Sequence, residues 1–113
     1  MQTKSLKDLV HFQDDAVRRE TLFETGHLWS EVLCFTAKQN LGPIADPASD
    51  ALLTVLAGEG RFVVGSRRRS LRQWGTVLVP AGDELSVYNV SEDPLVLLVV
   101  AAPPPAPSTG GQA

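Results

Sequence analysis

The sequence predicts an all-β fold in which short antiparallel strands form a sandwich or barrel. Three observations support this. The chain contains thirteen valines but only one isoleucine, and β-branched valine favours strands because it packs well on a pleated surface. Nine glycines and eight prolines interrupt the apolar runs, so that turns recur about every 8–12 residues. After residue 12, no stretch sustains the apolar spacing of a helix.

Length and charge narrow the class of protein. With 113 residues, the chain has room for one domain with a core of its own. A net charge of −3 and a pI near 5.2 predict no binding to nucleic acid or to an anionic membrane. The longest apolar run, eight residues from Leu95 to Ala102, is far shorter than the roughly 20 of a membrane-spanning helix. The first lysines precede no apolar stretch, which predicts that there is no signal peptide.

The first dozen residues differ from the rest of the chain. Ser5 is a candidate cap for a short turn or helix that carries Leu6, Leu9 and Val10. A first strand is then predicted over residues 17–23.

The next predicted strand, residues 28–36, is apolar on both faces. Val32 and Cys34 point to one side and Leu33 and Phe35 to the other, because successive side chains of a strand alternate. We therefore expect both faces to be covered. A second sheet is expected on one side, and an N-terminal strand or a partner subunit on the other. The second of these covers would make the chain a homodimer, which is the state we expect.

The later part of the chain reads as further strands separated by turns. Turns are predicted at residues 40–43, 46–50, 58–60 and 65–68, and strands at 51–57, 61–64, 70–72, 76–79, 85–90 and 95–101. Residues 1–102 are expected to form a single domain. Residues 103–113, rich in proline and glycine, are expected to be a disordered tail.

Two motifs in this strand pattern resemble those of the cupin superfamily. Residues 53–60 end at the glycine that closes the first cupin motif, Gly58, and Pro80-x-Gly82 followed by Asn89 fits the second. The resemblance covers about residues 38–102. It implies an antiparallel double-sheet barrel of the jelly-roll type, often homodimeric, which in many members carries a metal in the barrel mouth.

The positions of the metal ligands depart from the cupin pattern. Counting from the motif glycines and proline, the four ligand positions fall on Ile44, Asp46, Ala51 and Leu85. Only the aspartate offers a donor, whereas a first-row metal needs about three or four. We therefore expect a barrel without metal or other cofactor and with an apolar interior. Asp46, followed by proline, is expected in an exposed turn where its side chain binds nearby backbone, the alternative being a carboxylate that points inward.

A ligand pocket is predicted around these cupin positions and their neighbours. Its candidate residues are Ile44, Asp46, Ala51, Leu85, Asn89 and Cys34. For Cys34, an inert buried thiol is expected, and an unconventional metal or redox site beside His27 or Asp46 is the alternative. Both histidines, His11 and His27, are expected to be surface or packing residues, so that no catalytic residue is predicted.

An arginine cluster is the strongest anomaly in charge. Five of the ten basic residues lie between Arg61 and Arg72. Because side chains alternate along a strand, Arg67, Arg69 and Arg61 are candidates for one anion-binding patch. The alternative is a solvated hairpin whose charges keep a sheet edge from aggregating.

Three functions are compatible with these residues. The first is a cytoplasmic, non-catalytic, metal-free barrel that binds or senses a small apolar ligand. The second is a metal-dependent cupin enzyme, such as a dioxygenase or isomerase, that uses displaced donors including Asp46, Asp50, His27 or Cys34. The third is a structural or interaction protein whose barrel interior is filled.

Overall fold

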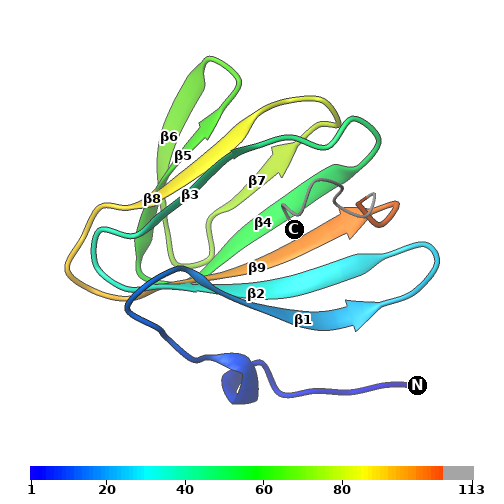
Figure 1. Ribbon diagram of the computed structural model, residues 1–113, viewed down its shortest axis with the longest axis horizontal. Coiled ribbons are helices and arrows are strands. Elements are labelled where there is room, and N and C mark those ends of the chain that lie inside the picture. The colour runs from blue at the N-terminus through cyan, green and yellow to red at the C-terminus, as the bar shows by residue number, and fades with distance from the viewer. Residues whose placement is uncertain (106–113) are drawn as a thin grey trace.

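Two antiparallel sheets face one another across a common core (Figure 1). The computed structural model describes residues 1–105. One sheet has the strand order β1-β2-β9-β4-β7 and the other the order β3-β8-β5-β6. The strands are β1 (Arg18–Glu24), β2 (Trp29–Phe35), β3 (Asn40–Ile44), β4 (Asp50–Ala57), β5 (Glu59–Val64), β6 (Arg67–Arg72), β7 (Thr76–Val79), β8 (Leu85–Asn89) and β9 (Leu95–Ala102). The predicted all-β double-sheet barrel is confirmed.

Alternate residues of the strands fill the space between the sheets. On β2, for example, Leu33 and Phe35 enter this core, whereas Val32 and Cys34 face outward, as the alternation predicts. The buried members of the core come from both sheets and are Leu33, Phe35, Leu53, Val55, Phe62, Val79, Leu85, Val87, Leu95, Leu97 and Val99.

The outer face of β2 is covered by the chain's own N-terminal segment. A 3₁₀ helix, η1 (Leu6–Leu9), brings Leu6, Leu9 and Val10 against Val32, Cys34 and Val96. The short helix was predicted, but the expected cap is wrong, because the side chain of Ser5 makes no capping hydrogen bond. This covering explains the second apolar face of β2 without a partner subunit.

Residues 40–43, predicted as a turn, lie in strand β3. The glycine and proline suggested a break, but β3 is at the edge of its sheet, where a proline that cannot donate a hydrogen bond is tolerated. The pairing of β3 with β8 shifts register between Leu41 and Ile44. Gly42 has a φ of +105°, and a Cβ there would collide with the carbonyl oxygen of Leu85. This position therefore requires glycine.

Two further turn predictions are corrected. Residues 58–60 are not a hairpin turn, because β4 and β5 belong to different sheets. The chain crosses between the sheets at Gly58, whose φ is +86° and where a Cβ would meet the carbonyl oxygen of Pro94. The predicted turn at 65–68 is shorter than expected, since β6 already begins at Arg67.

Two expectations remain: that no segment spans a membrane as a helix, and that the C-terminal residues form a disordered tail. Among residues 1–105, no helix is long and apolar enough to span a membrane. Most of the predicted disordered tail, residues 106–113, lies outside the described residues.

Candidate functional site

The two ends of the barrel differ in how tightly they are closed. At one end, inward-facing side chains such as Phe35, Val55 and Leu95 have no exposed surface. At the other end, Trp29, Ala51 and Val64 pack against the same core but stay partly exposed. We call these the closed end and the open end.

Three of the four cupin ligand positions lie at the open end. Ile44 pairs with Leu85 across β3 and β8, and Leu85 belongs to the same core cluster as Ala51 on the opposite sheet. Leu85 is buried, Ala51 is partly buried, and Ile44 is 41% exposed. The structure thus places these three residues around the opening of the barrel.

The residues at these positions do not fit a metal ion. The side chains of Ile44, Ala51 and Leu85 contain no oxygen, nitrogen or sulfur donor. The fourth position, Asp46, lies in the expected turn. Its Oδ1 accepts hydrogen bonds from the backbone N–H groups of Ala48 (2.8 Å) and Ser49 (2.9 Å).

The displaced donors are not gathered either. His27 is exposed, in the turn between β1 and β2, and the carboxylate of Asp50 accepts a hydrogen bond from the backbone of Ala81. Across residues 1–105, no three His, Cys, Asp or Glu side chains lie close enough together to hold a metal ion.

Cys34, a candidate pocket residue, lies apart from the open end. Its side chain is fully buried on the outer face of β2, under η1. Because burial disfavours the thiolate, the pKa of Cys34 is raised above its ordinary value. This environment is that of an inert thiol rather than a nucleophile.

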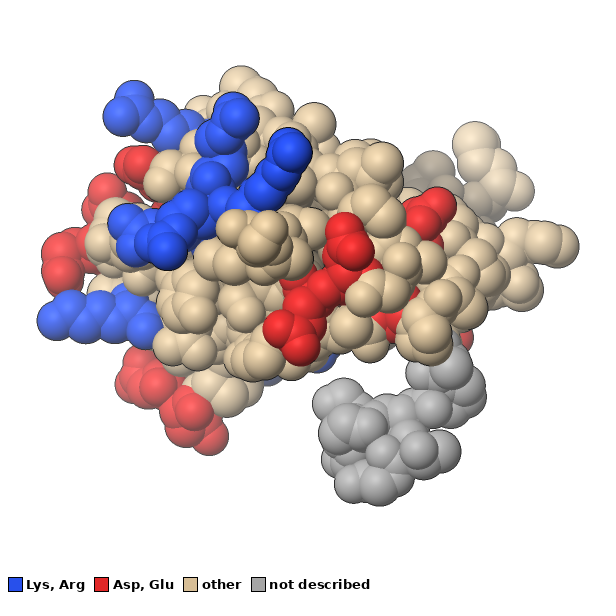
Figure 2. All heavy atoms as spheres, turned by 90° about the horizontal axis from the view of Figure 1, so that it is seen from above, with Lys and Arg blue, Asp and Glu red and all other residues tan. Residues whose placement is uncertain are grey.

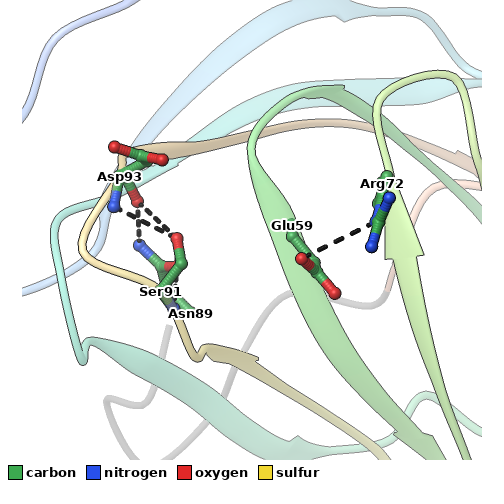
Figure 3. A network of polar contacts seen from close by, with 5 residues as sticks. All are labelled: Glu59, Arg72, Asn89, Ser91 and Asp93. Atoms are coloured by element: carbon green, nitrogen blue, oxygen red, sulfur yellow. Dashed lines mark hydrogen bonds and ion pairs between the residues drawn. The ribbon is translucent and has the colours of Figure 1, made fainter.

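Asn89, the other distant candidate, belongs to the closed end and holds a loop (Figure 3). Its Nδ2 donates hydrogen bonds to the carbonyl oxygens of Thr36 (3.0 Å) and Asp93 (2.8 Å). Its Oδ1 accepts one from the N–H group of Ser91 at 3.2 Å. This 2% exposed amide ties the β8–β9 loop to the chain after β2.

One polar pair at the barrel interior was missed by sequence reasoning. Glu31 of β2 lies two residues before the core residue Leu33 and four before Phe35. Alternate residues of a strand share a face, so Glu31 faces inward. Arg19 of β1 pairs with Leu33 and shares that face. Its guanidinium donates two hydrogen bonds to the Glu31 carboxylate, at 3.1 and 2.7 Å.

The Arg19–Glu31 pair places a charged group at a largely apolar wall. Glu31 is 4% exposed, and burial raises the pKa of its carboxyl group, while the Arg19 hydrogen bonds and charge lower it to a smaller extent. Glu31 pairs with Val99 of β9. Along β2 it lies between Trp29 at the open end and Phe35 at the closed end. A lone glutamate within an apolar strand, in register with its core residues, is the signal in the sequence that indicates this site.

Two surface hollows lie elsewhere on the described residues. The first, about 330 Å³, is lined by Gly58, Glu59, Arg72, Gln73, Ser91 and Asp93, near the Glu59–Arg72 ion pair drawn in Figure 3. The second, about 540 Å³, is lined by Thr3, Lys4, Ser5, Asp8 and Leu9. Neither includes a cupin ligand position.

Comparison with solved structures agrees with this architecture. A protein named TT1209 from Thermus thermophilus is 27% identical, with a TM-score of 0.87 over 91% of this chain and 98% of its own. An RmlC-like cupin from Desulfovibrio desulfuricans is 25% identical, with a TM-score of 0.81 over 91% and 97%. An uncharacterized Klebsiella pneumoniae protein with a double-stranded β-helix domain is 19% identical, with a TM-score of 0.85 over 91% and 90%.

No protein-family profile matches the sequence, and no curated protein matches it significantly. The structural likeness nevertheless defines the class. The chain has the fold of the cupin superfamily, as its two motifs indicated.

Proposed function

We propose that this protein is a non-catalytic cupin barrel that binds or senses a small, largely apolar molecule at its open end without a metal. The observation that carries the proposal is the set of side chains at the cupin ligand positions. Ile44, Ala51 and Leu85 have apolar side chains where a metal cupin needs donors. The free, buried thiol of Cys34 also supports the expected cytoplasmic location.

The open end has surface to offer such a ligand. Trp29, Val64 and Ala51 face the interior yet retain exposed area, and removing apolar area from water contributes about 25 cal/mol per Å². The Arg19 side chain, 37% exposed, is held by Glu31 and adds a polar anchor. An apolar molecule with one polar group therefore fits this end best.

Metal analysis tests the first half of the proposal. Protein purified without added metal is expected to contain iron, manganese, nickel and zinc at far below one equivalent. A near-stoichiometric amount of any of them would contradict the proposal.

Fluorescence tests the second half. In a Trp74→Phe variant, Trp29 is the only tryptophan and reports on the open end. We expect 1-anilinonaphthalene-8-sulfonate, an apolar ring system that carries one sulfonate group, to bind and to accept energy from Trp29.

Matched substitutions locate the probe. Ala51→Phe fills the open end and should abolish transfer from Trp29. Leu52→Phe, on the outer face of the same strand, should leave it intact. Equal effects of the two substitutions would place the probe elsewhere.

The third hypothesis, an interaction protein with a filled interior, is favoured by one observation. Eleven side chains of residues 1–105 form the buried core between the sheets, and Phe35, Val55 and Leu95 at the closed end have no exposed surface. A failure of every apolar probe to bind near Trp29, in a protein without metal, would favour this second candidate.

We further propose that two copies associate through the outer face of β4 and β7. Leu52 and Leu78 are cross-strand partners there, and they are 43% and 61% exposed. An exposed apolar sheet face is typical of an interface, and such a face can pair with itself around a two-fold axis. Leu78→Lys is expected to convert dimers into monomers in sedimentation analysis, whereas Val90→Lys, at a 48% exposed apolar residue outside this face, is not.

A further inference from the structure

The arginine cluster lies on an edge strand, which distinguishes it from an ordinary surface patch. Strand β6 ends the four-stranded sheet and pairs with β5 alone. It carries Arg67, Arg68, Arg69 and Arg72, and β5 adds Arg61. All five arginines are exposed. The other side of β6 therefore presents unpaired backbone groups flanked by positive charge.

The register corrects the grouping expected from the sequence. Arg61 pairs with Ser70, and Phe62, which enters the core, pairs with Arg69. Arg61 therefore shares the outer face with Arg68 and Arg72, not with Arg67 and Arg69. The edge of β6 carries arginines on both faces, two on the inner side and two on the outer.

These arginines have almost no acidic partners within the molecule. Arg72 lies 3.8 Å from Glu59. The other four form no ion pair with an acidic residue among the residues described, 1–105. Seen from the side toward which the β5–β6 hairpin projects, Lys and Arg side chains gather on one part of the surface (Figure 2). The cluster is thus available to an external anion.

We propose that the free edge of β6 is a docking edge for an extended, acidic segment of a partner protein, which adds to the sheet as a further strand. Backbone hydrogen bonds would hold the segment, as in other strand additions. Alternate residues of a strand lie about 7 Å apart, so Asp or Glu side chains on the segment would meet Arg67 and Arg69 on one face and Arg68 on the other.

The residue type favours this partner over a merely solvated edge. All five basic residues of the hairpin are arginine, although the chain has three lysines elsewhere. Arginine presents a planar fork that binds a carboxylate through two hydrogen bonds, whereas lysine is the usual residue for protecting an edge. A second copy of the same edge is disfavoured, because like charges would lie opposite one another.

The charge of the remaining surface favours a short acidic segment over a nucleic acid. The chain carries −3 in total, and the five arginines contribute five positive charges. The rest of the protein therefore carries a net −8 and would repel a long polyanion that extends beyond the hairpin. A segment that contacts only β6 avoids this repulsion.

Fluorescence anisotropy with a labelled peptide of alternating glutamate and valine tests the charge contribution. At low ionic strength, the unmodified protein is expected to bind this peptide, and Arg67→Gln/Arg69→Gln to weaken binding about tenfold or more. Lys7→Gln/Lys38→Gln removes the same charge elsewhere and should change the affinity little. Thermal unfolding shows that each variant folds. Equal weakening by the two pairs would overturn the proposal.

Backbone methylation of the probe separates strand addition from simple charge attraction. The amides of alternate residues point to the same edge of a strand, so one peptide is N-methylated at its valines and another at its glutamates. One of the two should lose binding and the other keep it. Equal binding of both would contradict strand addition, and tighter binding of single-stranded oligothymidylate or of phosphatidylserine vesicles would overturn the choice of partner. These results are independent of any ligand at the open end.

Discussion

The closed and open ends of the barrel are built from the same strands but satisfy different requirements. At the closed end, Phe35 and Leu95 are fully buried and Asn89 fixes the adjoining loop. At the open end, Ile44 remains 41% exposed and Trp29 is only partly covered. The difference indicates that the most tightly packed part of the core lies at one end, and that the other end leaves side chains accessible.

The largest effect is expected from a cavity at the closed end. Phe35→Ala removes a fully buried ring and should lower the free energy of unfolding by about 3–5 kcal/mol. Urea unfolding followed by circular dichroism measures this. A cost below that of the same substitution at Trp29 would contradict the assignment of the closed end.

The next effect concerns the amide of Asn89. Asn89→Ala leaves the carbonyl groups of Thr36 and Asp93 and the N–H group of Ser91 without the partner they have now. We expect a loss of about 2–3 kcal/mol. Asn89→Asp keeps the shape but replaces the two donor hydrogens by an acceptor, and it should be as destabilising at neutral pH. A mild effect of both variants in urea unfolding would show that the loop is held by other contacts.

Most of the fold could be predicted from the sequence. Valine alternation and turn spacing predicted most strands correctly, because local propensity and burial agree there. The motif Pro80-x-Gly82 with Asn89 predicted the superfamily fold. Strand β3 was missed because Gly42-Pro43 has the local signature of a turn, and only its place at a sheet edge makes it a strand.

The candidate site was predicted less completely than the fold, for a physical reason. The aliphatic positions Ile44, Ala51 and Leu85 follow from motif spacing alone, and the structure brings them to one end. Cys34 and Asn89 were grouped with them because sequence spacing does not show which face or end a residue occupies. The Arg19–Glu31 pair depends on the register between β1 and β2, which a single strand does not reveal.

The Arg19–Glu31 pair predicts a dependence of stability on pH at the barrel wall. Because burial raises the pKa of Glu31 from 4.5, the native state holds its proton more tightly than the unfolded state. The contribution of Glu31 to stability is therefore full below about pH 4.5 and is lost as pH rises through the raised pKa. Glu31→Gln should remove this part of the pH dependence in urea unfolding.

Arg19→Met sharpens this test. Without the guanidinium, the carboxylate of Glu31 loses its opposite charge, and we expect a cost of about 1–3 kcal/mol at pH 7, moderated because Arg19 is partly exposed. At pH 4 the cost should be smaller, since Glu31 is then protonated. A cost that does not change with pH would mean that Arg19 acts through packing alone.

The smallest effect is expected at the rim of the open end. Ile44→Ser exchanges a 41% exposed side chain for a polar one and should cost no more than about 1 kcal/mol, whereas Leu53→Ser, at a fully enclosed position of the same barrel, should cost several times as much. Because Ile44 lies at the opening, its replacement should weaken probe binding near Trp29 while leaving the unfolding transition almost unchanged. If Ile44→Ser weakens probe binding without lowering stability, the open end is a binding site. If it changes neither, the exposed side chains there are only the margin of the core.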